Sequence, residues 1–175
     1  ALNRNDLDLN NLEECYNYVI KFKPDWLVNC AAYTDVEGSE KNSEKAFRIN
    51  SFAPKYFAKA LKETGGKMLQ ISTDYVFDGE KGSPYEINDK INPLNVYGES
   101  KAMGEIFCED YLKSYNQLHV IRTSWVLSSK GKNFLNTMLK LLPNKKVLSV
   151  VRDQYGCITS TKSLAKVCWE LITKC

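Results

Sequence analysis

A tyrosine and a lysine four residues apart form the sharpest chemical pattern in the chain. They stand in the segment NVYGESK, residues 95–101, where a polar loop enters a predicted helix, so that Tyr97 and Lys101 share one helical face. A lysine ammonium beside a phenol is expected to lower the pKa of that phenol from its ordinary value of about 10. The phenol then serves as a general acid near neutral pH.

Hydroxyl side chains end the strand that precedes this helix. Ser72 ends the predicted strand at 67–72 and Thr73 follows it, and ligands of parallel α/β sheets bind at the carboxyl ends of strands. A hydroxyl from either residue, brought beside Tyr97, is expected to hold a carbonyl oxygen. A Tyr-x-x-x-Lys spacing alone recurs by chance in many helices. Its combination with this strand end and an α/β pattern is what indicates a hydride-transfer site.

Two further strand ends carry residues of the same kind. Ala31, Ala32, Tyr33 and Thr34 follow the strand at 26–30, and Thr-Ser-Trp at 123–125 follows the strand at 118–122. Small residues, hydroxyls and one large aromatic suit a cleft that admits a flat cofactor and a polar substrate. The signal is weak by itself, because loops after strands are polar in most α/β proteins.

Helices and strands alternate along the chain, and these elements must position the candidate residues. A helix capped at Asn10 and ended by Pro24 precedes a buried strand, and a helical stretch at 40–64 is broken at Pro54 and stopped by Gly65-Gly66. The alternation predicts an α/β fold with a Rossmann-like, doubly wound parallel sheet covered on both faces. The other predicted elements are strands at 67–72, 118–122 and 147–151 and helices at 97–114, 132–142 and 161–174, the last with Leu164, Val167, Cys168 and Leu171 facing inward.

Composition excludes several classes of function. The chain has 175 residues and a net charge of +3 with acids and bases interspersed, which argues against a nucleic-acid reader. It has no apolar run of membrane-spanning length and no visible signal peptide. The six cysteines form no C-x-x-C pair and are expected to be reduced thiols of a cytoplasmic protein, and His119, the single histidine, stands in an apolar strand where a structural role is expected.

Both ends of the chain interrupt the expected pattern. No apolar strand precedes Ala1, no glycine-rich turn follows a strand, and the chain closes at the end of a helix. We therefore expect residues 1–175 to form a partial NAD(P)-binding domain, truncated at both ends. Alone it is expected to fold poorly and to bind NAD(P)H weakly, because a missing first strand would expose a sheet edge.

The sequence resembles the dTDP-4-dehydrorhamnose reductase family of extended short-chain dehydrogenases over nearly its whole length. The most specific motifs are STDYVFDG at 72–79 and PLNVYGESK at 93–101. Further matching stretches are VNCAAYTDV at 28–36, Ile49-Asn50, Gly104-Glu105, RTSWV at 122–126, GKNF at 131–134 and DQYG at 153–156.

The resemblance implies a role for each matching residue. Tyr97 is the expected proton donor, Lys101 the residue that binds the nicotinamide ribose, and Thr73 the hydroxyl that orients the keto group. Asp74 and Trp125 are expected to line the sugar site. The reaction implied is reduction of the C4 ketone of dTDP-4-dehydro-L-rhamnose by NADPH or NADH. The expected partner is a dTDP-sugar substrate, without nucleic acid or membrane, and a homodimer is an expected assembly. The remaining cofactor contacts implied are Asp8 and Leu9 near the adenine and Ala31, Ala32, Tyr33 and Thr34 along the cofactor.

The chain departs from the family pattern in places. Ile158 stands where a proline is usual, and a modest local effect is expected. Lys162 stands where members that bind magnesium at a dimer contact carry an acid, so no metal is predicted.

Other functions stay open. One alternative is a reductase or epimerase of another nucleotide sugar, which would keep the fold and the catalytic pair. Another is a non-catalytic regulatory subunit similar to that of methionine adenosyltransferase, which resembles the same family. A structural or binding module with an accidental Tyr-x-x-x-Lys is the third. Retention of Thr73, Tyr97 and Lys101 favours an enzyme.

Overall fold

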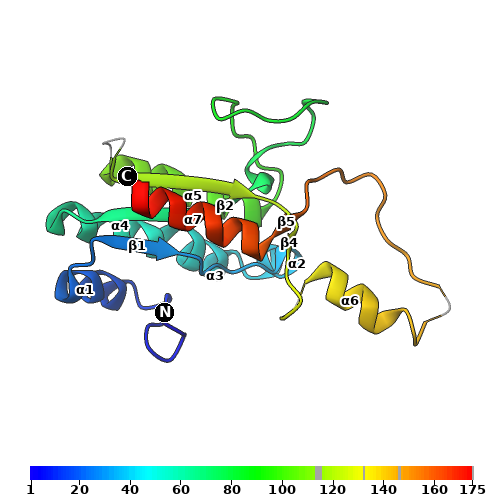
Figure 1. The fold of residues 1–175 in the computed structure, drawn as a ribbon, viewed down its shortest axis with the longest axis horizontal. Coiled ribbons are helices and arrows are strands. Elements are labelled where there is room, and N and C mark those ends of the chain that lie inside the picture. Colours follow the sequence, from blue (N-terminus) through cyan, green and yellow to red (C-terminus); the bar gives the residue numbers. More distant parts are fainter. Residues whose placement is uncertain (113–115, 132, 146, 175) are drawn as a thin grey trace. The chain divides into compact units, whose positions relative to one another are not determined.

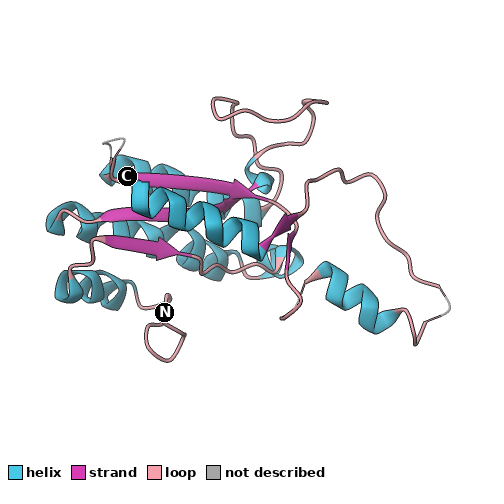
Figure 2. Cartoon of the chain, in the orientation of Figure 1, coloured by secondary structure: helices cyan, strands magenta, loops and turns pink. Residues whose placement is uncertain are grey.

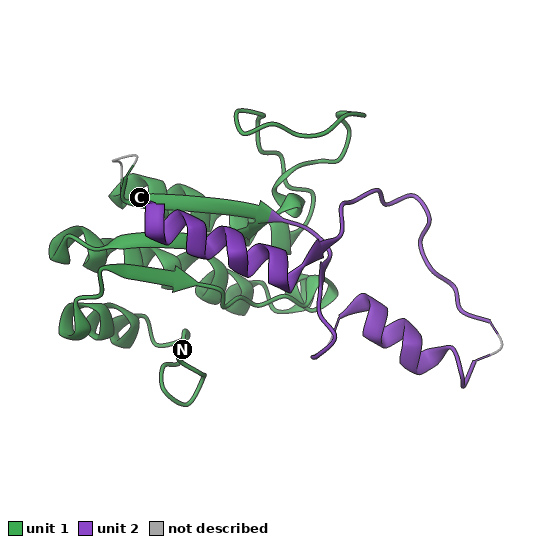
Figure 3. Ribbon diagram, in the orientation of Figure 1, with its two compact units in different colours: residues 1–122 green, residues 123–175 purple. Residues whose placement is uncertain are grey.

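A computed structural model describes residues 1–112, 116–131, 133–145 and 147–174, which form an α/β fold (Figure 1). The chain divides into two compact units, Ala1–Arg122 and Thr123–Cys175, coloured separately in Figure 3. The first unit contains α1 (Leu12–Phe22), β1 (Trp26–Asn29), α2 (Val36–Lys41), α3 (Ser43–Phe47), the π-helical turn η1 (Arg48–Phe52), α4 (Ala53–Thr64), β2 (Lys67–Thr73), the 3-10 turn η2 (Asp74–Val76), α5 (Val96–Tyr111) and β3 (Leu118–Thr123).

Three strands form the sheet of the first unit in the order β1-β2-β3. β1 and β2 are parallel, with Trp26 opposite Lys67 and Asn29 opposite Gln70, and the three arrows point the same way in Figure 2. The predicted parallel sheet is therefore confirmed. The prediction that β1 is buried is wrong, because β1 lies at an edge of this sheet and only Asn29 is buried while Val28 is 40% exposed.

Helices α4 and α5 pack against β2 and against each other, and α1 packs on α4 (Figure 1). The core between them is apolar and close-packed, as the helical spacing of these residues predicts. Its main members are Cys15, Val19, Phe57, Leu61, Met68 and Cys108.

The local sequence sets where the first helix begins and ends. Asn11 caps α1 by accepting a hydrogen bond from the backbone N–H of Glu14 at 3.2 Å. The predicted cap at Asn10 is one residue off, because the Asn10 side chain donates to Asp8 instead. Lys23 takes a left-handed backbone conformation just before Pro24, which ends the helix as predicted.

The helical stretch begins at Val36 rather than near residue 40, and its breaks differ from the prediction. It is interrupted at Asn42, and Pro54 lies within the first turn of α4 rather than between two separate helices. Proline has no N–H to offer the carbonyl of Asn50, and the chain widens into η1 immediately before it. Gly65, with a φ of 80°, ends α4 as expected.

The second unit contains a pair of short parallel strands and two helices. These are β4 (Val126–Leu127), α6 (Phe134–Leu141), β5 (Thr159–Ser160) and α7 (Thr161–Lys174). The predicted strand at 147–151 is wrong: the described residues there form no strand, and Val147 and Val151 are 80% and 63% exposed. An apolar run needs a partner backbone before it becomes a strand.

The boundaries of the later helices are close to those predicted. α7 matches its predicted range, with Cys168 buried, although Val167 is exposed rather than inward. α5 ends at Tyr111, and residues 113–114 of its predicted range lie outside the described residues, as do Lys132 and Cys175.

The described cysteine thiols and the single histidine agree with the roles expected from the sequence. The thiols of Cys15, Cys108, Cys157 and Cys168 are free. The ring of His119 stacks on Trp26 with the centroids 5.5 Å apart, which agrees with its expected structural role. Among the described residues, no helix is long and apolar enough to cross a membrane.

Candidate active site

The end of β2 and the first turn of α5 bring Thr73 and Tyr97 together. Thr73 is buried, its hydroxyl donates to Oδ1 of Asp74 at 3.1 Å, and it also accepts the backbone N–H of Tyr75 at 3.2 Å. The Thr73 side chain lies close enough to the Tyr97 phenol to lower its pKa. The predicted proximity of the strand-end hydroxyl and the tyrosine is therefore present in the structure.

Burial of Tyr97 sets the protonation state of its phenol. Desolvation raises the pKa of Tyr97 above its ordinary value, the Thr73 side chain opposes this, and the negative charge of Asp74 raises it further. The prediction that Lys101 lowers this pKa is wrong here, because Lys101 is not among the groups that shift it. The phenol therefore holds its proton at neutral pH, which is the form that a proton donor needs.

Asp74 shares this environment. Burial raises the pKa of its carboxyl, while hydrogen bonds from Thr73 and from backbone N–H groups lower it. The ring of Tyr75 packs edge-on against Tyr97, with centroids 5.6 Å apart. Thr73, Asp74, Tyr75 and Tyr97 thus form one compact group of hydroxyl and carboxyl side chains at the end of β2.

Lys101 lies one turn further along α5 and is buried. Its Nζ donates to the backbone carbonyl of Ile71 in β2 at 2.6 Å. Burial lowers the pKa of Lys101 to about 8, opposed by the negative charge of Glu105 and by Cys108 and Cys30. The side chain is therefore held against the strand that carries Thr73, with a proton that it can lose just above neutral pH.

The start of α5 is fixed by capping and by one glycine. Asn95 caps the helix by accepting from the N–H of Gly98 at 2.8 Å, and the N–H of Val96 donates to Glu40 of α2 at 2.9 Å. A Cβ on Gly98 would lie 2.2 Å from the carbonyl oxygen of Tyr75. Only glycine therefore lets the helix approach η2 closely enough for Tyr97 to reach Thr73.

Asn50 holds the loop after β1 and was given no role by the sequence analysis. Its Oδ1 accepts from the N–H of Tyr33 at 2.8 Å, and its Nδ2 donates to the carbonyl of Tyr33 and to Oγ of Ser100, each at 3.0 Å. Oγ of Ser100 in turn donates to the carbonyl of Tyr97 at 2.8 Å. Asn50 is 1% exposed, and these hydrogen bonds satisfy its buried amide.

The residues expected near the adenine lie in the turn just before α1. Asp8 is exposed and accepts hydrogen bonds from Asn10, which hold the pKa of its carboxyl below the ordinary value, while Leu9 packs partly buried against the core. Lys45 acts electrostatically on Asp8 and lies over the ring of Tyr33 at 5.7 Å. Next to them is an open recess of about 400 Å³, lined by Asn10, Arg48 and residues 41–45.

The small residues of the loop after β1, which are expected to lie along a cofactor, are accessible. Ala31 and Thr34 are exposed and Ala32 is half-buried, and the N–H of Ala31 donates to Oδ1 of Asn29 at 3.2 Å. The loop therefore presents backbone and small side chains at the carboxyl end of β1, the end of the sheet at which Thr73 closes β2.

Trp125 belongs to the second unit and is described within it. Its backbone φ is 43°, its ring packs edge-on against Phe134 at 5.1 Å, and a Cβ on Gly156 would lie 2.5 Å from its Nε1. The tight approach of Gly156 explains why a glycine follows the DQY segment. The Ser124 hydroxyl donates to the carbonyl of Cys157 at 2.7 Å, which ties the same two segments together.

Comparison with known proteins gives one consistent result. The family model described as "RmlD substrate binding domain" matches residues 1–175. A dTDP-4-dehydrorhamnose reductase of Aggregatibacter actinomycetemcomitans is 38% identical over 174 residues, covering 99% of this chain and 58% of that protein. The spore coat polysaccharide biosynthesis protein SpsK of Bacillus subtilis is 41% identical over 152 residues, covering 87% of this chain and 53% of SpsK.

Solved structures agree with the fold. A dTDP-4-dehydrorhamnose reductase of Clostridium acetobutylicum superposes with a TM-score of 0.91 at 37% identity, over 99% of this chain and 60% of that one. The Bacillus anthracis reductase in complex with NADP gives a TM-score of 0.90 at 34% identity, over 98% and 60%. The Rossmann-like α/β fold is therefore confirmed, and the chain spans little more than half the length of these relatives.

The group around Thr73 and Tyr97 and the match over all 175 residues lead to the same conclusion: the chain belongs to the RmlD substrate binding domain family, as its resemblance to dTDP-4-dehydrorhamnose reductases predicts.

Proposed function

We propose that the protein reduces the C4 ketone of dTDP-4-dehydro-L-rhamnose to the alcohol, using NADPH or NADH. The observation that carries this proposal is the compact group of Thr73, Asp74 and Tyr97 at the end of β2, in which Thr73 bonds Asp74 and both side chains influence the Tyr97 phenol. The names of the relatives, several of which are dTDP-4-dehydrorhamnose reductases, support the substrate, and the NADP bound to the Bacillus anthracis relative supports the cofactor.

The residues fit a nicotinamide cofactor at the sheet edge. The accessible loop at residues 31–34 offers backbone and small side chains along its length, and Asp8 and Leu9 are proposed to lie near the adenine. Lys101 would hold the nicotinamide ribose, for which its Nζ must exchange the carbonyl of Ile71 for ribose hydroxyls. The bound cofactor supplies the hydride.

The proton and the orientation come from the chain. Tyr97 is the proposed donor of a proton to the oxygen at C4, and Thr73 is proposed to donate a hydrogen bond to the same oxygen. Asp74 and Trp125 are proposed to line the sugar. Asp74 has a second effect, because its negative charge raises the pKa of Tyr97 and so favours the protonated phenol.

Several finer predictions belong to this proposal. They are a partial NAD(P)-binding domain at residues 1–175, a homodimer, the absence of a metal ion and of nucleic-acid or membrane partners, and a cytoplasmic location.

A substrate panel tests the proposal. Oxidation of NADPH or NADH, followed by absorbance, is expected with dTDP-4-dehydro-L-rhamnose and to be much slower with other 4-keto nucleotide sugars. Faster turnover of another nucleotide sugar would move the assignment to that substrate. Cofactor binding with no turnover of any sugar would favour the regulatory-subunit alternative.

A further inference from the structure

Arg122, the penultimate residue of β3, pairs with a carboxylate that is almost completely buried. Glu105 of α5 is 2% exposed, and its two oxygens accept from Nε of Arg122 at 3.1 and 3.2 Å and from Nη2 at 2.7 Å. A buried carboxylate is costly unless it is paired and hydrogen-bonded. The guanidinium of Arg122 provides both the opposite charge and the hydrogen-bond donors, and so links β3 to α5, the helix that carries Tyr97 and Lys101.

The guanidinium of Arg122 also lies over an aromatic ring from the segment that follows Thr73. Its Cζ is 5.1 Å from the centroid of the Phe77 ring, and Phe77 stacks on Tyr85 with centroids 4.1 Å apart and an angle of 8° between the ring planes. A planar cation on an aromatic face is a favourable contact that an ammonium makes less well. Arg122 therefore contacts both α5, which carries Tyr97, and the segment that follows β2 and η2.

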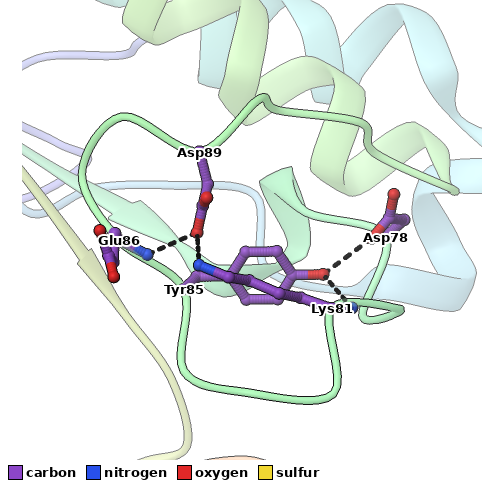
Figure 4. Close-up of polar contacts among 5 residues, drawn as sticks. All are labelled: Asp78, Lys81, Tyr85, Glu86 and Asp89. Carbon is purple, nitrogen blue, oxygen red and sulfur yellow. Dashed lines mark hydrogen bonds and ion pairs between the residues drawn. The ribbon is translucent and has the colours of Figure 1, made fainter.

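The loop beyond Phe77 is closed on itself by polar contacts (Figure 4). The Tyr85 hydroxyl donates to Oδ1 of Asp78 at 2.7 Å, Lys81 pairs with Asp89, and the N–H of Glu86 donates to the same carboxylate of Asp89 at 2.6 Å. The loop is thus an ordered unit whose stacked rings, Tyr85 on Phe77, connect it to Arg122.

Glu105 links this arrangement to Lys101. The two residues are one helical turn apart, and the negative charge of Glu105 raises the pKa of Lys101 against the effect of burial. The other groups acting on Lys101 are Cys108 on the same helix and Cys30 after β1. The charge of Glu105 therefore helps Lys101 to stay protonated.

We infer that Arg122 is a positioning residue for the reaction proposed above: through Glu105 on one side and Phe77 on the other, it fixes α5 against the segment that follows Thr73. The alignment of Tyr97 with Thr73 depends on that spacing. Arg122 itself touches neither Tyr97 nor Thr73 in any described contact, so its effect is exerted through its two partners.

The test compares Arg122→Lys, which keeps the charge but loses the fork and the stacking, with Arg152→Lys, which alters an exposed arginine of the second unit. For Arg122→Lys, kcat is expected to fall about tenfold or more, while the dissociation constant for NADPH changes less than about twofold. Arg152→Lys should match the wild type. An unchanged kcat per folded Arg122→Lys molecule, even with a lower Tm, overturns the inference.

Two further readouts separate this inference from the proposed function. Trypsin should cut the loop at Lys81 or Lys90 faster in Arg122→Lys than in Arg152→Lys, whether or not the protein reduces any sugar. Equal cleavage of the two variants contradicts the inference that Arg122 holds this loop.

Glu105→Gln should shift the fall of kcat/KM at high pH to a lower pH, because the charge that raises the pKa of Lys101 is removed. A fall that stays at the same pH contradicts the link to Lys101. If the wild type turns over no sugar, the proposed function fails, and the cleavage result alone decides the inference.

Discussion

Single residues show best what sequence reasoning can and cannot supply. The pairing of Thr73 with Tyr97 is predictable from the type and spacing of the residues, because strand ends and helix starts meet at one edge of a parallel sheet. The pKa of Tyr97 is not predictable in this way. The sequence places a lysine one turn away, but the Lys101 ammonium donates a hydrogen bond to the carbonyl of Ile71. Burial and the charge of Asp74 raise the pKa of Tyr97 instead.

The lowered pKa of Lys101, about 8, gives a pH dependence with a definite sign. The ammonium is present below that pH and is lost as pH rises through it, so kcat/KM is expected to fall above pH 8 if the charge is needed to hold the cofactor. Lys101→Arg keeps a positive charge at all these pH values, so the fall of kcat/KM above pH 8 should disappear while kcat/KM itself is lower. A fall at the same pH in the wild type and in Lys101→Arg would assign the titration to another group.

At the scale of elements, the sequence predicts where helices and strands occur better than how they approach one another. α5 and β2 lie within about a residue of their predicted starts, because apolar periodicity marks them. The contacts of Asn50 depend on packing against α5, because its amide donates to Ser100 of that helix, and no local pattern contains this contact. The apolar run at 147–151 failed as a strand prediction for the same reason, since pairing is a property of the fold.

Gly104 gives a prediction at this scale. A Cβ at this position would lie 2.2 Å from the carbonyl oxygen of Asn50, which is backbone and cannot swing aside. Gly104→Ala is therefore expected to push α5 away from η1 and to lower the free energy of unfolding by about 1–3 kcal/mol, measured by urea denaturation. Met103→Ala, at a neighbouring position that is 38% exposed, is the matched control and should cost less. Equal stability of Gly104→Ala and wild type would contradict the close approach.

For the whole molecule, the fold class and the family follow from the sequence, while the completeness of the site does not. The residues at the ends of β1 and β2 and at the start of α5 gather within the first unit, whereas Trp125 belongs to the second. This chain covers 58% of the Aggregatibacter actinomycetemcomitans relative and 60% of the Clostridium acetobutylicum structure. Activity, substrate and partners of the whole protein are therefore proposals that rest on the residues described here.

Tyr97 is proposed to donate the proton in reduction of a nucleotide-sugar ketone. Single-turnover oxidation of NADPH with dTDP-4-dehydro-L-rhamnose should be compared in wild type, Tyr97→Phe and Tyr75→Phe, where Tyr75 is the neighbouring ring 5.6 Å away. The rate is expected to fall about a hundredfold or more for Tyr97→Phe, with cofactor binding intact and Tyr75→Phe close to wild type. A Tyr97→Phe protein that oxidises NADPH at the wild-type rate would contradict this proposal.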